Sequence, residues 1–182
     1  MMPKTRRTLP LLLCLSLLAC KSEDGFVHSS IALEHLGMDC GPTPVDKNVL
    51  TGQKSISGDT LDNASGAPLK FADVPIIPAE RGTTFGAVIS FNYAPQSNIL
   101  TAHVNHPPMG DRKTTTQNWP VKYKDSAQTL IGYQLEDPED LIPGTWTFKL
   151  YDGETLLLEK SLELSPSRED LPPKAPCLLV RR

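Results

Sequence analysis

Apolar and polar residues alternate over several stretches of the chain with a period of two, which is the pattern of half-buried β-strands. The most regular stretch runs from Thr84 to Tyr93, and its apolar face carries Phe85, Ala87, Ile89, Phe91 and Tyr93. This pattern predicts a central core strand over 84–93. A turn at 95–98 and an antiparallel partner strand over 99–105 are expected to follow it.

A second hairpin is expected further along the chain. Apolar residues alternate over 145–150 and again over 156–164, and the Asp152-Gly153 pair between them favours a tight turn. Trp146 is the largest apolar residue of this hairpin, so we expect it in the core. Weaker patterns of the same kind predict further strands over 27–36, 53–57, 69–77 and 126–135, with the proline-interrupted 69–77 at a sheet edge.

The segment from His106 to Asp125 does not follow the pattern and is expected to be a long loop. Long loops in compact domains are uncommon unless they carry function. The segment contains Trp119 and Tyr123, which we take as candidate ligand contacts, because an exposed aromatic ring on a rigid β-scaffold stacks on sugars or anchors a protein. The alternative is that Trp119 folds over a sheet edge.

Together these elements predict an all-β protein, a β-sandwich of about seven to eight antiparallel strands. The composition agrees, since 17 prolines among 182 residues disfavour long helices. We expect the sandwich domain over 27–164 and a proline-rich C-terminal tail over 165–182.

The N-terminal residues have the features of a secretory leader followed by a lipidation site. Residues 1–19 combine three cations with an apolar stretch that is too short to span a bilayer. Leu17-Leu18-Ala19-Cys20 then resembles the lipobox of bacterial lipoproteins, in which the cysteine sulfur receives a diacylglycerol. We expect Cys20 to anchor the chain through a tether over 20–26, the alternative being an ordinary signal peptide with a chance cysteine. Lys21 replaces the aspartate that retains many lipoproteins in the inner membrane, which favours the outer membrane, facing the periplasm.

Charge and cysteine content narrow the compartment and the class of partner. The formal net charge is −3, and losing the leader makes it about −6, so nucleic acid is not expected as a partner. Cys14 belongs to the leader and Cys20 is the expected lipidation site, which leaves Cys40 and Cys177. In an exported protein such a pair favours a disulfide. The alternative is two unpaired thiols.

Known catalytic motifs are missing from the sequence, which has no Gly-x-Ser-x-Gly elbow, no His-Glu-x-x-His helix and no glycine-rich phosphate loop. His103 and His106 are the clustered histidines and hence the candidates for a metal site, but residues three apart on an extended strand point to opposite faces. The acidic segments at 59–63 and 136–140 are interpreted as solvated turns rather than calcium loops. We expect no cofactor, no metal and no catalytic residue.

Three motifs stand out along the chain: Gly82-Thr83-Thr84-Phe85-Gly86, His106-Pro107-Pro108-Met109, and Leu141-Ile142-Pro143-Gly144-Thr145-Trp146-Thr147-Phe148. Over roughly residues 27–164 the chain resembles a bacterial family of exported proteins with a domain of unknown function, of the DUF3859 type. The resemblance implies a compact, β-rich, immunoglobulin-like domain. It implies no established activity and no catalytic residues.

The sequence as a whole indicates a cell-envelope lipoprotein that acts as a non-catalytic binding or scaffold module, with the membrane and an envelope protein or glycan as partners. One alternative is a carbohydrate-recognition module that uses the loop around Trp119. The other is a metal-assisted hydrolase built on His103 and His106.

Overall fold

The fold is known from a computed structural model that describes residues 25–41, 70–125, 128–167 and 177. Within these residues the elements are β1 (Phe26–Val27), β2 (Ile31–Asp39), β3 (Phe71–Asp73), β4 (Ile76–Pro78), β5 (Thr84–Phe91), β6 (Ile99–Met109), β7 (Thr114–Lys122), β8 (Thr129–Gln134), the 3-10 helix η1 (Pro138–Asp140), β9 (Gly144–Asp152) and β10 (Thr155–Ser165). The expected leader, Cys20, the strand over 53–57 and the acidic segment at 59–63 lie outside the described residues.

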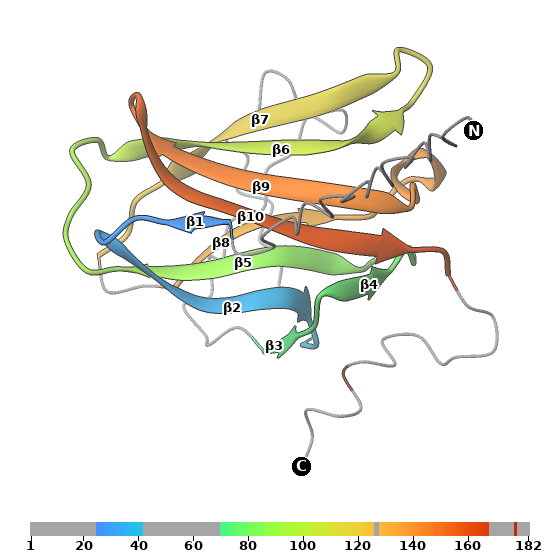
Figure 1. The fold of residues 1–182 in the computed structure, drawn as a ribbon, viewed down its shortest axis with the longest axis horizontal. Helices are drawn as coiled ribbons and strands as arrows, with labels where there is room; N and C mark the ends of the chain where they lie inside the picture. Colours follow the sequence, from blue (N-terminus) through green and yellow to red (C-terminus); the bar gives the residue numbers. More distant parts are fainter. Residues whose placement is uncertain (1–24, 42–69, 126–127, 168–176, 178–182) are drawn as a thin grey trace, which may run out of the picture.

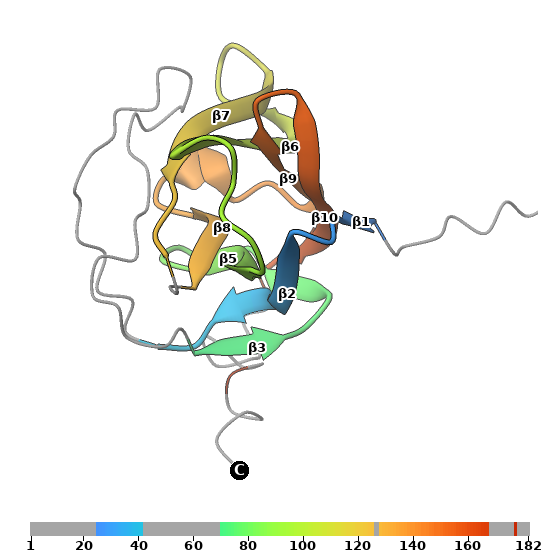
Figure 2. The same ribbon diagram turned by 90° about the vertical axis from the view of Figure 1, so that its left-hand side faces the viewer.

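The strands form two sheets that pack face to face (Figures 1 and 2). Sheet A has the order β1-β10-β9-β6-β7, and β4 also pairs with β10. Sheet B has the order β3-β2-β5-β8. Among the described strands, the pairing of β4 with β10 is parallel and the other pairings are antiparallel. The predicted all-β sandwich is therefore confirmed.

The core lies between the two sheets and contains large aromatic rings. Phe85 of β5 and Trp146 and Phe148 of β9 are fully buried. The Phe85 ring meets the other two rings edge-on, with centroid distances of 5.3 Å and 5.5 Å. This geometry brings the positive edge of one ring to the negative face of another. The prediction of Trp146 as a core residue is confirmed.

Two predicted elements are found where they were expected. β5 lies between β2 and β8, which makes it a central strand of sheet B. β9 and β10 form the predicted hairpin, and Gly153 adopts a φ of +57° in its turn. A register shift between Leu156 and Leu158 allows Leu157 and Leu158 both to be buried, so β10 departs from strict alternation at this point.

The predicted hairpin between 84–93 and 99–105 is wrong. β5 belongs to sheet B, whereas β6 lies in sheet A between β7 and β9. Both edges of β5 are occupied, by β2 and β8, so the following strand has no edge of β5 left to join. The turn residues at 95–98 mark a reversal of the chain, but they do not determine which sheet the next strand enters.

The predicted loop over 106–125 is also wrong, because β6 continues to Met109 and β7 begins at Thr114. The prolines that suggested a loop lie at positions where strands tolerate proline. Pro107 and Pro108 lie where the β6–β7 register shifts between Asn105 and Met109, and Pro120 lies on β7, an edge strand of sheet A.

The expected strand over 27–36 is divided between the two sheets. β1 pairs with β10 in sheet A, and after a turn at 29–30 the chain enters sheet B as β2, which continues to Asp39. The segment 69–77 is divided in the same way. Its first part, β3, lies at the edge of sheet B, as predicted for a proline-interrupted strand, and its second part, β4, joins sheet A.

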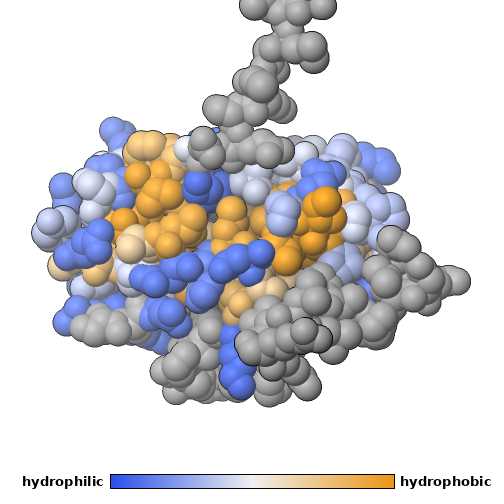
Figure 3. All heavy atoms as spheres, turned by 60° about the horizontal axis from the view of Figure 1, so that its bottom comes forward, coloured by the Kyte–Doolittle hydropathy of each residue, from blue (hydrophilic) through white to orange (hydrophobic). Residues whose placement is uncertain are grey.

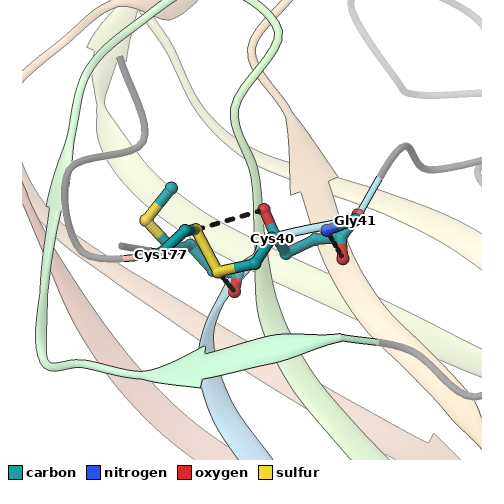
Figure 4. The surroundings of a disulfide bond; sticks show 5 residues. Cys40, Gly41 and Cys177 are labelled. Atoms are coloured by element: carbon teal, nitrogen blue, oxygen red, sulfur yellow. Dashed lines mark hydrogen bonds between the residues drawn. A yellow bond between two sulfur atoms is a disulfide. The ribbon is translucent and has the colours of Figure 1, made fainter. Parts of the chain in front are cut away.

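A disulfide bond joins Cys40, directly after β2, to Cys177 (Figure 4). The two Cα atoms are 5.3 Å apart. Cys177 is buried, and Cys40 packs against the core between the sheets. The predicted disulfide is therefore confirmed. Within the described ranges, no helix has the length and apolar character that crossing a membrane requires.

Candidate functional site

The described residues contain one cluster of buried polar side chains inside the sandwich. His106 comes from β6, Gln117 from β7 and Tyr133 from β8, and Asp140 belongs to η1. All four are buried, and Trp146 of β9 packs against two of their rings. Because β6 and β8 end here and β9 begins here, the cluster lies at one end of the sandwich and bridges sheets A and B.

Gln117 is the centre of the cluster. Its Nε2 lies 3.2 Å from His106 Nε2 and 3.4 Å from the Tyr133 hydroxyl. An amide nitrogen carries two hydrogens, so Gln117 can donate to both groups at once. Buried polar side chains are stable only when such partners replace water.

Asp140 closes the chain of hydrogen bonds and shapes the backbone around it. The Tyr133 hydroxyl donates to Asp140 Oδ1 at 3.2 Å. Asp140 Oδ2 accepts hydrogen bonds from the backbone N–H groups of Glu136 and Asp137, at 3.0 Å and 2.9 Å. The interpretation of 136–140 as a solvated turn is therefore wrong for Asp140, which is buried and fixes the turn before η1.

The hydrogen bonds of His106 define its tautomer. Nδ1 lies 2.8 Å from the carbonyl oxygen of Pro107, which can only accept, so Nδ1 carries the proton. In the neutral ring Nε2 then accepts from Gln117. The imidazole also stacks on Trp146, with a centroid distance of 4.9 Å and an interplanar angle of 30°. Burial lowers the pKa of His106, against smaller raising contributions from Pro107 and Asp140.

Tyr133 is held in its protonated form. Burial is the main cause that raises the pKa of its hydroxyl, and the nearby Asp140 carboxylate adds to the shift. A phenol that donates to a carboxylate would lose this hydrogen bond on ionisation. The cluster thus contains an uncharged imidazole and an uncharged phenol, each hydrogen-bonded to its neighbours.

The two candidate metal-binding histidines do not come together. On β6 the His106 side chain faces the core, whereas His103, three residues earlier, lies on the opposite, partly exposed face and packs edge-on against Tyr151 at 5.2 Å. In the described part of the chain, no three His, Cys, Asp or Glu side chains are grouped so as to hold a metal ion.

The candidate ligand contact Trp119 does not lie on an exposed loop. It belongs to β7 and is 7% exposed, so its ring is not open to a sugar or a protein partner. The prediction failed because the threonines and prolines around Trp119 concealed a strand whose alternate residues, Gln117, Trp119 and Val121, face the core. Tyr123 follows β7, is partly exposed, and packs edge-on against Phe91 at 5.1 Å.

The three sequence motifs meet around this cluster. Phe85 of the first motif and His106 of the second both contact Trp146 of the third. The backbone of Gly144 approaches Pro107 so closely that a Cβ would come within 2.8 Å of the Pro107 ring, and its φ of +131° also favours glycine. The motifs are therefore parts of one packing arrangement. Gln117, Tyr133 and Asp140 lie outside them, and no sequence signal singled out these three residues.

The chain is similar to a known protein family and to a solved structure. A model of the family described as "Domain of unknown function (DUF3859)" matches residues 49–164, which include all three motifs. Among solved structures, an immunoglobulin-like protein from Pseudomonas aeruginosa is similar, with a TM-score of 0.47 and 17% sequence identity, over 78% of this chain and 97% of that chain. No curated protein matches the sequence.

Proposed function

The chain belongs to the DUF3859 family, a family of unknown function, and we propose that it acts in the bacterial cell envelope as a lipid-anchored, non-catalytic binding or scaffold module. Cys20 carries the lipid, and the sandwich faces the periplasm from the outer membrane. The partner of the module is another envelope protein or a glycan.

The observation that carries this proposal is the disulfide between Cys40 and Cys177. Disulfides persist in oxidising compartments outside the cytoplasm and are rare inside it. Their pairing also accounts for both cysteines beyond the lipobox, which leaves Cys20, directly after the leader, as the residue for acylation.

A non-catalytic role is supported by the buried cluster at the end of the sandwich. A general acid or base has to reach its substrate, directly or through one water. His106 and Tyr133 are instead buried and hydrogen-bonded to Gln117, and burial disfavours the charged form of each. The cluster therefore has the properties of a structural network that ties the two sheets together.

The lipid anchor is tested with the full chain expressed in a bacterium and separated into soluble and membrane fractions. Mass spectrometry of the mature N-terminus is expected to find Cys20 with a diacylglycerol. The Cys20→Ser variant should lose this modification, while the Cys14→Ser variant, altered inside the leader, should keep it. An intact leader on the wild-type chain, or an unmodified Cys20 in its mature form, would contradict the proposal.

The binding role is tested by chemical crosslinking in intact cells, followed by purification of the chain under denaturing conditions. A module of this kind should retain a specific envelope protein or a cell-wall glycan fragment. The Cys20→Ser variant serves as a control, because a partner in the outer membrane should be recovered less from a chain that is no longer anchored. Turnover of an envelope substrate by the purified protein, lost on substitution of His106, would replace this proposal with an enzymatic one.

A further inference from the structure

One side of the sandwich exposes apolar side chains where β1 and β4 extend sheet A along the same edge of β10. Phe26 of β1 is 42% exposed and Ile76 of β4 is 57% exposed. Phe26 pairs with Glu159 and Ile76 with Glu163, so both side chains lie on the same face of sheet A. Their separation along β10 is about 13 Å, the rise of four strand residues.

Sheet B continues this apolar side through the first residues of β2, 31–36, which pair with β5 but have no partner in β3. β2 contacts β1, β4 and β10, and its Leu33 and Leu36 are only partly buried. Figure 3 brings the bottom of the Figure 1 view forward and shows hydrophobic side chains gathered on this side of the molecule, with polar ones between them. We call this surface the apolar side strip, and it consists of Phe26, Val27, Leu33, Leu36, Val74 and Ile76. Exposed apolar patches on soluble domains mark interaction surfaces.

The position of the strip in the chain indicates what covers it. Phe26 follows Cys20 by six residues, and an extended chain spans 3.3–3.6 Å per residue, so β1 stays within about 20 Å of the lipidated cysteine. β1 is thus the part of the sandwich that the tether holds next to the bilayer. Because the strip begins where the tether ends, it is the apolar surface that the tether brings to the lipid.

The charged residues paired with Phe26 and Ile76 are Glu159 and Glu163, and the Glu163 carboxylate accepts a hydrogen bond from the Thr145 hydroxyl at 2.9 Å. Lys160 lies on the other face of β10 from Glu159 and Glu163, since it pairs with the buried Phe148, and its aliphatic stem lies beside Gly25. The nearby Glu159 carboxylate pairs with Lys149 at 3.1 Å, so its negative charge is offset.

We propose that the apolar side strip rests on the lipid bilayer to which Cys20 anchors the chain. The inference rests on the proposed lipidation of Cys20. Phe26 and Ile76 insert among the headgroups and upper acyl chains. β7, at the opposite edge of sheet A, then points away from the membrane. Anchoring by lipid and by an apolar protein surface together is stronger than either alone.

The orientation is tested by fluorescence quenching with the full lipidated chain in vesicles of phosphatidylcholine and phosphatidylglycerol, part of whose acyl chains carry bromine. A single tryptophan is introduced at the strip, as Phe26→Trp or Ile76→Trp. The matched control is Ile99→Trp on β6, since Ile99 is 59% exposed, as Ile76 is, but β9 and β10 separate β6 from the strip. The native Trp119 and Trp146 are buried and contribute the same background to every variant.

The strip variants are expected to lose most of the added emission to the brominated lipid, while the control keeps its added emission. Flotation of the vesicles is measured first. A chain that does not float with them refutes the lipid anchor itself. A chain that floats but shows equal quenching at positions 26, 76 and 99 refutes only the orientation. A third result would also refute the proposal: strip tryptophans that the brominated lipid does not quench, but that become more protected as the protein density on the vesicles rises. This result would assign the strip to a second copy of the chain.

Discussion

Truncating Trp146 is the most direct test of how the two sheets are held together. The indole is fully buried and contacts Phe85, His106 and Tyr133, with ring centroids 5.3, 4.9 and 5.2 Å away. Its Nε1 donates to the carbonyl oxygen of Ile142 at 3.3 Å. The Trp146→Ala variant removes all of these contacts at once and leaves a cavity between rigid strands.

The size of the effect follows from these contacts. Truncation of a buried tryptophan to alanine costs about 3–5 kcal/mol, depending on how far the site collapses. Aromatic pairs contribute about 0.5–1.5 kcal/mol each beyond burial, and Trp146 is surrounded by three rings from both sheets. We therefore expect a loss of about 4–5 kcal/mol for Trp146→Ala. For Trp146→Phe, which keeps a ring but not the hydrogen bond, we expect about 1–2 kcal/mol.

Urea unfolding followed by far-ultraviolet circular dichroism measures both losses with the disulfide intact. A loss of about 4–5 kcal/mol is a large part of the stability of an ordinary domain, so Trp146→Ala is expected to be partly unfolded at 37 °C. Trp146→Phe keeps the test informative if the alanine variant does not fold. An unfolding midpoint unchanged in Trp146→Ala, or equal losses in the two variants, would refute the packing argument.

Four further predictions follow from the structure. Asp140→Ala leaves three donors without their acceptor and should lower the free energy of unfolding by about 2–4 kcal/mol in urea titrations. The lowered pKa of His106 means that the unfolded chain binds a proton at higher pH than the folded chain. The free energy of unfolding should therefore be full above pH 6.5 and fall below it by at most about 1.4 kcal/mol per pH unit. The His106→Gln variant should lose this slope. Replacing both Cys40 and Cys177 by serine opens a loop with a sequence separation of 137 and should cost about 4–5 kcal/mol, while a denaturation midpoint insensitive to reductant would contradict it. Gly144→Ala places a Cβ 2.8 Å from Pro107 at a φ of +131° and should cost about 1–3 kcal/mol by thermal unfolding, whereas Gly153→Ala, at a φ of +57° with open space around it, should cost less.

The period-two pattern predicted the strands whose two faces differ in polarity. β9 was predicted well because Trp146, Phe148 and Leu150 face the core while the residues between them are partly exposed. β5 was predicted as a central strand, but its second face is not polar. Val88 is fully buried on that face and forms a separate cluster with Phe71 and Leu130. A pattern that records one buried face does not reveal that a strand is covered on both sides.

The pairing of strands was predicted less well, because it depends on which edges remain available. Turn residues at 95–98 suggested that β5 and β6 pair, yet β2 and β8 occupy both edges of β5. The covalent order of the chain favours neighbours in sequence, whereas the sandwich needs strands to cross between its sheets so that both apolar faces are covered. Such crossings have no local signature in the sequence.

The buried cluster shows the same limit at the level of side chains. His106 and Trp146 belong to motifs that the sequence singled out, and the structure explains both by their stacking. Gln117 appeared to be one polar residue among threonines, because nothing local distinguishes an amide that will be fully buried from one in solvent. Its importance depends on Tyr133 and His106, which arrive from other strands and supply the acceptors for its two amide hydrogens. A buried polar residue on an edge strand is stable only with such partners. The sequence of β7 alone therefore does not predict that Gln117 is buried.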